Sequence, residues 1–344
     1  MKIQNILDFL PDEFENILKN QLKQPSYRAG QVFEQIYKQH IFQYEEMTIL
    51  PQVLRTELTK EFTLLFPVIK AKRVSKDETV KYLFELEDGI CVETVFIPEG
   101  SRRTVCFSVQ AGCPLDCSFC ATGRGGFRRN LTTAEIIGQV LAVEQDTGTR
   151  MTNCVAMGQG EPFLNGDAVK KAIRIFHDPR CCGISARHMT ISTVGIIPGI
   201  LELAEFPLPV KLAVSLHSAR QNIRERLIPI SKKYPLDNLK KAIRRYVDAT
   251  NNRVTVEYIL LENINDGEAD AEALLDFSRG LPVYVNLIPW NPVDKIDLPP
   301  SSPKSVRAFY KTLVTNGLEA AVRKEKGQDI AAACGQLTQQ FLHV

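Results

Sequence analysis

The sequence predicts an α/β fold, a partial (β/α)6 barrel with a small helical domain before it and a tail after it. Three observations lead to this prediction. From about residue 104, apolar strand patterns alternate with amphipathic helix patterns, a loop with three cysteines directly follows the first of these strands, and the chain begins with helical patterns broken by prolines. Apolar strands that alternate with helices indicate a parallel sheet covered by helices.

The first 98 residues divide into two parts. Residues 1–65 predict a small helical domain, because apolar side chains recur three or four positions apart between scattered prolines. Residues 66–98 predict a β-hairpin linker, because apolar and polar residues alternate on both sides of a glycine-containing turn at 87–89.

Residues 99–344 hold the predicted barrel and the tail. Strands are expected at 104–109, 153–157, 188–194, 210–216, 254–261, 283–288 and 318–323. Helices are expected at 132–147, 166–177, 198–205, 236–249, 268–279 and 303–316. Thr132 and Glu135 have the spacing of a capping box at the start of the first helix. The βα units also fit a doubly wound sheet, but the cysteine loop after the first strand favours the barrel, in which βα loops carry the chemistry.

Composition narrows the class of protein. Of the 344 residues 44% are hydrophobic, enough for a sizeable core, and 42 Lys and Arg nearly balance 40 Asp and Glu. The nine cysteines do not form a secreted disulfide framework. The first residues lack the pattern of a signal peptide, and no apolar run approaches the roughly 20 residues that span a bilayer. A cytoplasmic protein with reduced thiols and no membrane association is therefore expected.

The most specific motif is the loop Cys113-Pro-Leu-Asp-Cys117-Ser-Phe-Cys120. Three thiolates in a C-x3-C-x2-C run suit an iron–sulfur cluster. A 4Fe–4S cubane needs four ligands, so this loop leaves one iron open to another molecule. A structural zinc site normally has four protein ligands, and no cysteine or histidine follows at a suitable spacing before Cys154. The cluster is favoured, with zinc or a chance group of buried cysteines as the alternatives.

Polar and glycine residues recur where the predicted strands end. Gly160 and Glu161 follow the second strand, and the Glu161 carboxylate could accept hydrogen bonds from a cationic amine. The other candidates are Ser192, Ser215, Leu216, His217 and Asn291. Each alone is an ordinary strand end or turn, and His217 also fits a histidine whose hydrogen bonds are satisfied. Together on one rim they fit a small-molecule site.

Two further cysteines stand apart from the loop. Cys106 lies inside the first barrel strand, where a lone cysteine is usually a small buried hydrophobe. Cys334 lies among small residues near the end of the chain, which suits a mobile nucleophile and a packed tail helix equally well. The remaining cysteines are interpreted as structural: Cys91, Cys154, Cys181 and Cys182.

Basic residues cluster in spite of the small net charge. Nine Lys or Arg lie between Arg220 and Arg245, against the two acids Glu225 and Asp237. Others follow the cysteine loop or precede Cys334: Arg124, Arg128, Arg129, Arg323, Lys324 and Lys326. A charged stretch is most often a solvated helix face. Groups near one rim also fit contacts with nucleic-acid phosphates, and both interpretations stay open.

Taken together, these motifs resemble those of the RlmN/Cfr family of radical S-adenosylmethionine (SAM) RNA adenosine methyltransferases. The likeness runs from about residue 5 to the end of the chain. The motifs occur in family order: Ser26–Phe33, Val92–Val95, Cys106–Cys120, Gly160–Pro162, Ser192–Gly195, Ser215–His217, Asn286–Pro289 and Ala333–Leu337. The resemblance implies a TIM-like radical SAM barrel, a 4Fe–4S cluster on the three loop cysteines, and SAM at the open iron.

The resemblance also implies a mechanism that uses two SAM molecules per turnover. Cys334 would take a methyl group from the first SAM as a nucleophile. The second SAM would be cleaved reductively to a 5′-deoxyadenosyl radical, which would remove hydrogen from that methyl group. The resulting methylene radical would add to the adenine. Cys106 would then resolve the protein–RNA adduct, leaving a Cys106–Cys334 disulfide, and Glu93 matches the position of a proton acceptor.

By the same likeness, seven residues would bind SAM, with Glu161 facing its ammonium group: Gly160, Glu161, Ser192, Ser215, Leu216, His217 and Asn291. Two departures from the family pattern stand out. Gln159 replaces a common Met, and Lys326-Gly327-Gln328-Asp329 replaces a more usual Arg-Gly-Asp-Asp. The second departure lies where RNA or the tail has to be positioned.

The expected reaction is methylation of carbon 2 of an adenosine in 23S rRNA and in tRNA anticodon loops. A Cfr-type reaction at carbon 8 of the same rRNA base is the nearest alternative, and an iron–sulfur or zinc RNA-binding protein without catalysis is another. The helical domain is expected to contact RNA. The family likeness further implies an electron donor of the flavodoxin or ferredoxin type, and a monomer is expected.

Overall fold

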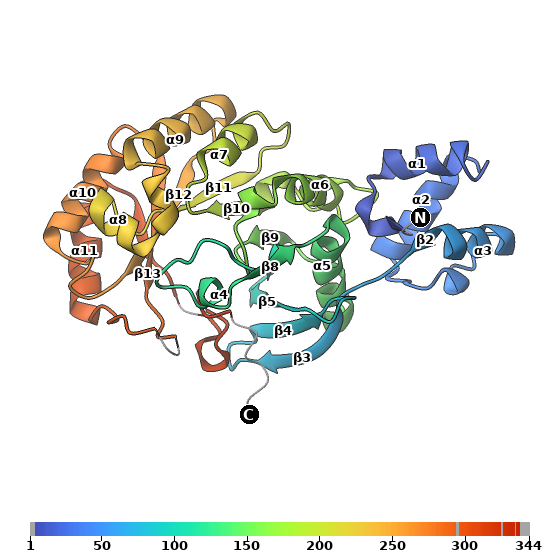
Figure 1. The fold of residues 1–344 in the computed structure, drawn as a ribbon, viewed down its shortest axis with the longest axis horizontal. Helices are drawn as coiled ribbons and strands as arrows, with labels where there is room; N and C mark the ends of the chain where they lie inside the picture. The colour runs from blue at the N-terminus through green and yellow to red at the C-terminus, as the bar shows by residue number, and fades with distance from the viewer. Residues whose placement is uncertain (1–3, 294–295, 325, 334, 338–344) are drawn as a thin grey trace.

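Residues 4–293, 296–324, 326–333 and 335–337 are described by the computed structural model (Figure 1). Within them, one ten-stranded sheet has the strand order β14-β13-β12-β11-β10-β9-β6-β5-β4-β3. From β6 to β14 its strands run parallel and follow one another in sequence order. A doubly wound sheet would reverse its order at a switch point. The strands therefore form the predicted partial barrel.

The barrel elements occur where the sequence predicts them. The parallel strands are β6 (Arg102–Cys106), β9 (Asn153–Ala156), β10 (Met189–Thr193), β11 (Lys211–Ser215), β12 (Val254–Leu260), β13 (Val283–Pro289) and β14 (Ala320–Val322). The predicted helices between them are α5 (Thr133–Thr147), α6 (Gly166–His177), α7 (Ile197–Ala204), α9 (Leu236–Thr250), α10 (Glu268–Ser278) and α11 (Pro303–Thr315). The capping box at α5 is present, because Thr132 Oγ1 accepts from the Glu135 N–H at 3.1 Å and Glu135 accepts from the Thr132 N–H at 2.8 Å.

Three antiparallel strands extend the barrel sheet beyond β6, the first of its parallel strands. They are β3 (Val68–Val74), β4 (Val80–Glu85) and β5 (Cys91–Glu99). The predicted hairpin is formed by β4 and β5, and β5 continues the sheet by pairing with β6. The boundaries of this segment as a linker stay a prediction.

The N-terminal helices form a separate lobe beside α5 and α6 (Figure 1). They are α1 (Pro11–Asn20), α2 (Tyr27–Tyr37) and α3 (Gln52–Glu61), and the parallel pair β1 (Gln4–Asn5) and β2 (Phe62–Thr63) joins the two ends of the lobe. Its centre is aromatic, with rings of Phe9, Phe14, Phe33 and Phe62 in contact. Burial of several aromatic rings is a large stabilising contribution for so short a segment.

Buried polar contacts attach this lobe to the barrel. Glu144 of α5 is fully buried and lies 3.1 Å from both His40 Nε2 and Arg150 Nη1. Asp8 of the lobe accepts a hydrogen bond from the Ala134 N–H at 2.8 Å, at the first turn of α5. The apolar core is also continuous from the lobe into the barrel.

Several short elements were not predicted. They are α4 (Ala121–Arg124), α8 (Gln221–Leu227), the antiparallel pair β7 (Gln110–Gly112) and β8 (Phe127–Asn130), and 3₁₀ turns at Ile6–Asp8, Tyr44–Glu46, Pro162–Leu164, Ala186–His188, Pro229–Lys232 and Gln328–Ile330. Of these, α4, α8, β7 and β8 surround the cysteine loop. In the described part of the chain, no helix has the length and apolar character needed to cross a membrane.

Candidate active site

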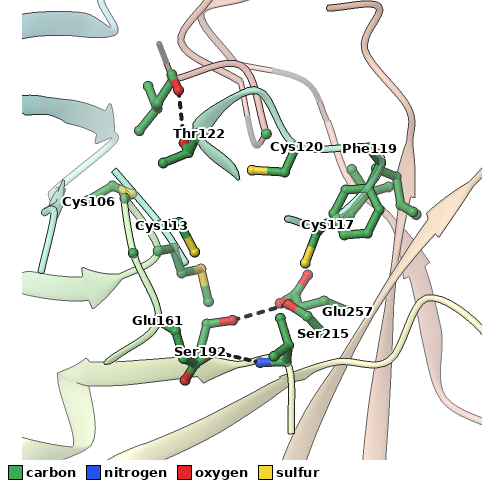
Figure 2. Close-up of a pocket in the computed structure, with 18 of the residues that line it drawn as sticks. Cys106, Cys113, Cys117, Phe119, Cys120, Thr122, Glu161, Ser192, Ser215 and Glu257 are labelled. Carbon is green, nitrogen blue, oxygen red and sulfur yellow. Dashed lines mark hydrogen bonds between the residues drawn. The ribbon is translucent and has the colours of Figure 1, made fainter. Parts of the chain in front are cut away.

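A cavity opens at the carboxyl ends of the parallel strands, where barrels of this type carry their chemistry. It holds about 1190 Å³ of empty space, including the solvent at its mouth. Its wall combines the cysteine loop, residues of strands β5, β6 and β9 to β13, and the C-terminal tail (Figure 2). A cavity on this scale can hold a small molecule together with a cofactor.

The cysteine loop is anchored by the pairing of β7 with β8, which lie on either side of it. Gly112 has a φ of +80°, and a Cβ added to it would lie 1.8 Å from the carbonyl oxygen of Gly126. Only glycine allows both this backbone conformation and this approach. The chain then turns directly into Cys113. Within the loop, the Cys120 N–H donates to the Cys117 carbonyl at 3.1 Å.

The sulfur atoms of Cys113, Cys117 and Cys120 face the cavity (Figure 2). Burial raises the pKa of the Cys113 thiol to about 12 and that of Cys117 well above its ordinary value. Metal binding at these thiols must therefore displace protons. Among the described residues, no three His, Cys, Asp or Glu side chains are grouped closely enough to hold one metal ion. The loop supplies three thiols, one fewer than the four protein ligands of a structural zinc site, so it fits an iron–sulfur cluster with one open iron better than zinc.

A buried arginine supports the strand ends beside the loop. Arg224 of α8 is only 1% exposed. Its guanidinium donates to the carbonyl oxygens of Val194, Ser215 and Leu216, the bond to Ser215 measuring 3.0 Å. Burial lowers its pKa to about 10, and the nearby Cys117 opposes that shift. This cation therefore ties the loops after β10 and β11 together directly beside a proposed cluster ligand.

The Gly-Glu turn after β9 brings Glu161 into the cavity wall. Its buried carboxylate accepts from the N–H groups of Val194 at 2.9 Å and Phe163 at 3.2 Å. Desolvation raises its pKa to about 7 in spite of these hydrogen bonds. Gly160 has a φ of +100°, and a Cβ there would lie 2.5 Å from the side chain of Gln110. Glycine thus lets the turn approach β7, where Gln110 accepts from the Glu161 N–H at 2.9 Å.

Ser192, Ser215 and His217 also line the cavity. The two serine hydroxyls lie 3.5 Å apart (Figure 2). Nδ1 of His217 accepts from the Ile259 N–H at 3.1 Å, and desolvation lowers the histidine pKa to about 3. The ring is therefore neutral at pH 7, with its proton on Nε2. Leu216 differs from these residues, because its side chain is fully buried in the main apolar core.

Asn291 lies in a smaller pocket beside the main cavity. Its side-chain oxygen accepts from Gln328 Nε2 at 2.8 Å. Gln328 is one of the two departures from the family pattern. The other, Gln159, is buried and accepts from the backbone N–H of Glu93 at 3.4 Å. Both replacements therefore contact residues to which the resemblance assigns a function.

Glu93 and Cys106 lie on the neighbouring strands β5 and β6. Cys106 lines the cavity. Glu93 is fully buried, and its carboxylate forms an ion pair with Lys81 of β4 at 3.0 Å. The Glu93 carbonyl accepts from Ser108 Oγ at 2.6 Å, and Ser108 in turn exchanges two backbone hydrogen bonds with the buried Gln139 side chain. This network fixes the backbone of β5 against the loop after β6.

The tail crosses the cavity next to the cysteine loop. Cys334 lies outside the described residues, so its pairing with Cys106 stays a prediction. The residues on either side of it, Ala333 and Gly335, line the cavity. Thr122 Oγ1 of α4 donates to the carbonyl of Leu337 at 2.8 Å (Figure 2).

Sequence reasoning missed three polar residues around the site: Lys81, Arg224 and Glu257. Glu257 lines the cavity, accepts from Asn286 Nδ2 at 2.7 Å, and has its pKa raised by desolvation. A carboxylate inside the otherwise apolar strand at 254–261 was an available signal for it. Arg224 was counted in a basic stretch interpreted as a solvated face or an RNA contact. Its burial shows that it belongs to neither.

Comparisons with known proteins agree with this geometry. Residues 4–64 match the family model of the ribosomal RNA large subunit methyltransferase N-terminal domain, and residues 107–275 match the radical SAM superfamily. A probable dual-specificity RNA methyltransferase RlmN of Dictyoglomus turgidum is 43% identical over 344 residues, 99% of this chain and 98% of the relative. A relative of the same name from Thermotoga neapolitana is 44% identical over 336 residues, 97% of each chain.

The structural comparison is equally extensive. The crystal structure of a radical SAM methyltransferase from Sphaerobacter thermophilus matches with a TM-score of 0.94 and 41% identity, covering 98% of this chain and 100% of that one. The hydrogenase maturase HydG shares the fold alone. It matches with a TM-score of 0.50 and 16% identity, over 65% of this chain and 52% of that one. The chain belongs to the RlmN family of radical SAM RNA methyltransferases.

Proposed function

We propose that this protein methylates carbon 2 of a specific adenosine in 23S rRNA and of an adenosine in tRNA anticodon loops. The observation that carries the proposal is a single cavity lined by the cysteine loop, the Glu161 turn, Cys106 and the tail residues around Cys334. The relatives are named dual-specificity RNA methyltransferases, which supports two classes of RNA substrate.

The three loop cysteines, Cys113, Cys117 and Cys120, hold a 4Fe–4S cluster in this proposal, with SAM at the open iron. When bound, the cluster supplies the electron that cleaves SAM. Phe119 packs in the same apolar group as Cys117 and limits the access of water to this region. Two SAM molecules are used per turnover, one as methyl donor to Cys334 and one as radical source.

Glu161 is the proposed partner of the SAM ammonium group. Two backbone N–H groups fix its carboxylate at the cavity wall, and a carboxylate held in this way pairs strongly with an ammonium. Gly160 gives close backbone access. The remaining proposed contacts come from the hydroxyls of Ser192 and Ser215, the backbone of Leu216, His217 and the amide of Asn291.

Cys334 is the proposed methyl carrier and Cys106 the resolving thiol, with Glu93 as the proton acceptor. Cys106 packs in the same small apolar group as Leu337 of the tail. The described residues next to position 334, Ala333 and Gly335, line the same cavity as Cys106, which supports this pairing of roles. The resolving step would leave a disulfide between the two cysteines.

The remaining partners are proposed on charge and family membership. Arg124 and Arg128 are exposed beside the cysteine loop, where they are placed to contact phosphates near the cavity. The helical lobe, attached to the barrel through Glu144, is the proposed second RNA contact. A flavodoxin- or ferredoxin-type protein would supply electrons, and the protein would act as a monomer.

Nucleoside mass spectrometry tests the proposed reaction. The protein is expressed in a strain lacking its own enzyme, and the RNA is compared with 2- and 8-methyladenosine standards. Finding 2-methyladenosine in both rRNA and tRNA is the expected result. Finding only 8-methyladenosine would replace it with the Cfr-type reaction, and finding neither would contradict methylation of adenosine.

The affinity for SAM is expected to fall as the pH drops below about 7. Desolvation raises the pKa of Glu161 to about 7, so lower pH converts the carboxylate that would bind ammonium into the neutral acid. Below that pKa, each pH unit removes about nine-tenths of the carboxylate, which limits the loss of affinity to about ten-fold per unit. Equilibrium binding of SAM to the cluster-loaded enzyme measures this profile.

Glu161→Gln is the control for this profile. It should bind SAM more weakly at pH 7 and show a much flatter dependence on pH, because no carboxylate titrates at that position. A wild-type affinity that stays constant between about pH 5.5 and about pH 7 would contradict the assignment of Glu161.

Cys106→Ala is expected to keep the cluster but accumulate a covalent RNA adduct through Cys334, because the adduct would lose its resolving thiol. The adduct appears on denaturing gels as a protein species sensitive to ribonuclease. The double variant Cys106→Ala/Cys334→Ala should lose it. Absence of any adduct from Cys106→Ala purified out of cells would count against the resolving role.

A further inference from the structure

The turn between β3 and β4 is tied to the tail by reciprocal hydrogen bonds. Ser75 Oγ donates to Asp329 Oδ1 at 2.5 Å, and the Lys76 N–H donates to Asp329 Oδ2 at 3.2 Å. In the opposite direction, the Gly327 N–H donates to Asp77 Oδ2 at 3.2 Å. The turn therefore donates hydrogen bonds to a carboxylate of the tail, and the tail donates one to a carboxylate of the turn.

Lys81 of β4 forms a second contact with the tail, and this contact is buried. Its side chain is only 5% exposed, and its ammonium lies 3.0 Å from Glu93 Oε1. The same ammonium donates to the carbonyl of Ala331 at 3.0 Å. Ala331 stands three residues before Cys334. One buried cation thus contacts both the proposed proton acceptor and the backbone of the segment that carries the proposed nucleophile.

The tail is also held by contacts at residues that follow position 334 in the sequence. The Ala121 N–H of α4 donates to the Gly335 carbonyl at 2.9 Å, and Thr122 donates to Leu337. Those contacts come from the helix that follows the cysteine loop. Lys81 therefore contacts the tail from the β4 side at residue 331, and α4 contacts it from the side of the cysteine loop at residues 335 and 337.

A purely structural role explains this arrangement less well. A buried Lys–Glu pair usually stabilises a fold no more than two well-packed apolar side chains of similar volume do. The second contact of Lys81 goes to the tail carbonyl of Ala331, however, which an apolar side chain could not bind.

We propose that Lys81 is a positioning residue for the tail. Through the Ala331 carbonyl it sets the docked position of the segment that carries Cys334, and through its ion pair it fixes that position relative to the Glu93 carboxylate. This inference deepens the proposed function and rests on its assignment of Cys334. Without the Lys81 ammonium, the tail keeps its contacts at residues 327–329 but loses the described anchor nearest to position 334 on that side, so it docks less often while the cysteine loop stays intact.

Hydrogen exchange of the cluster-loaded protein without RNA tests this directly. Lys81→Met keeps most of the stem and removes the ammonium. We expect exchange of the amides of residues 326–337 to accelerate about ten-fold or more, which corresponds to loss of one hydrogen bond from a charged donor. Peptides from β10 to β12 should exchange as in wild type, and iron content and SAM cleavage by dithionite should change less than about two-fold.

The matched control is Lys72→Met, which removes a lysine from the adjacent strand β3. Lys72 forms an exposed ion pair with Asp146 at 2.7 Å, so this variant should leave tail exchange unchanged. The double variant Lys81→Met/Glu93→Gln buries no lone carboxylate and still reads out tail exchange if Lys81→Met folds poorly. Wild-type tail exchange in both Lys81 variants would overturn the proposal, as would acceleration spread equally over all strands.

Methyl transfer to Cys334 gives the functional readout. Intact-mass analysis after incubation with SAM should show methylation slowed at least about ten-fold in Lys81→Met and unchanged in Lys72→Met. Slowed methylation supports positioning, and methylation at the wild-type rate contradicts it. Because neither readout uses RNA, a wild-type enzyme that failed to make methyladenosine in cells would refute the proposed function and leave the tail-exchange result standing.

Discussion

Replacing Cys117 with alanine is expected to abolish iron retention and all reductive cleavage of SAM. Cys117 is the middle cysteine of the loop in sequence. It is 7% exposed, and its side chain lines the cavity. A cubane that depends on three protein thiolates loses a third of its protein ligands with this change. Iron and sulfide analysis after anaerobic reconstitution, together with chromatography of 5′-deoxyadenosine formed with dithionite, measures both effects.

Cys182→Ala is the matched control for this experiment. Cys182 is 8% exposed, so it is buried to nearly the same extent, but it packs in the main apolar core away from the cavity. This variant should retain iron, with only the modest loss of stability that follows removal of a small buried side chain. A Cys117→Ala protein with a full complement of iron and sulfide would refute the ligand assignment.

Arg224→Gln is expected to destabilise the protein by at least about 3 kcal/mol, because three buried carbonyls lose their donor. The change removes a buried cation that donates to the carbonyl groups of Val194, Ser215 and Leu216, and the shorter amide cannot replace those three hydrogen bonds. Buried carbonyls left without a donor cost about 1 to 3 kcal/mol each. A lowered urea midpoint measures the loss, and iron content should fall as well, because α8 packs on the cysteine loop.

Arg226→Gln provides the comparison on the same helix. Arg226 is exposed, and substitution of an exposed residue usually changes stability by less than about 0.5 kcal/mol. Equal urea midpoints for the two glutamine variants would show that the buried guanidinium does not support the strand ends. A midpoint lowered only in Arg224→Gln, with weaker iron retention, is the expected outcome.

The barrel could be predicted because its signals are local. Each apolar strand and amphipathic helix is recognisable within about ten to fifteen residues, and the capping box of Thr132 and Glu135 marked a helix start that the structure has. The helix α8 was missed because it spans only Gln221–Leu227, too short for a clear periodic pattern. Its charges then suggested a surface, although Arg224 turns inward to strand-end carbonyls from other parts of the chain.

The cavity residues were predictable for a related reason. Parallel strands bring their carboxyl ends to one rim, so Glu161, Ser192 and Ser215 could be grouped before their distances were known. Lys81 could not be found in this way. In an alternating strand pattern it looks like an ordinary solvent-facing residue, and the carbonyl that it binds lies 250 positions away in the chain.

The hydrogen bond between Gln328 and Asn291 has a thermodynamic consequence. It joins the tail to a residue proposed to bind SAM, so tail docking and SAM binding share a contact. If SAM changes the strength of that contact, the free energy by which SAM favours or opposes docking must equal the free energy by which docking changes the affinity for SAM. The tail then acts as an intramolecular effector of the proposed SAM site. The fraction of molecules with a docked tail can therefore differ between binding of the first SAM and binding of the second.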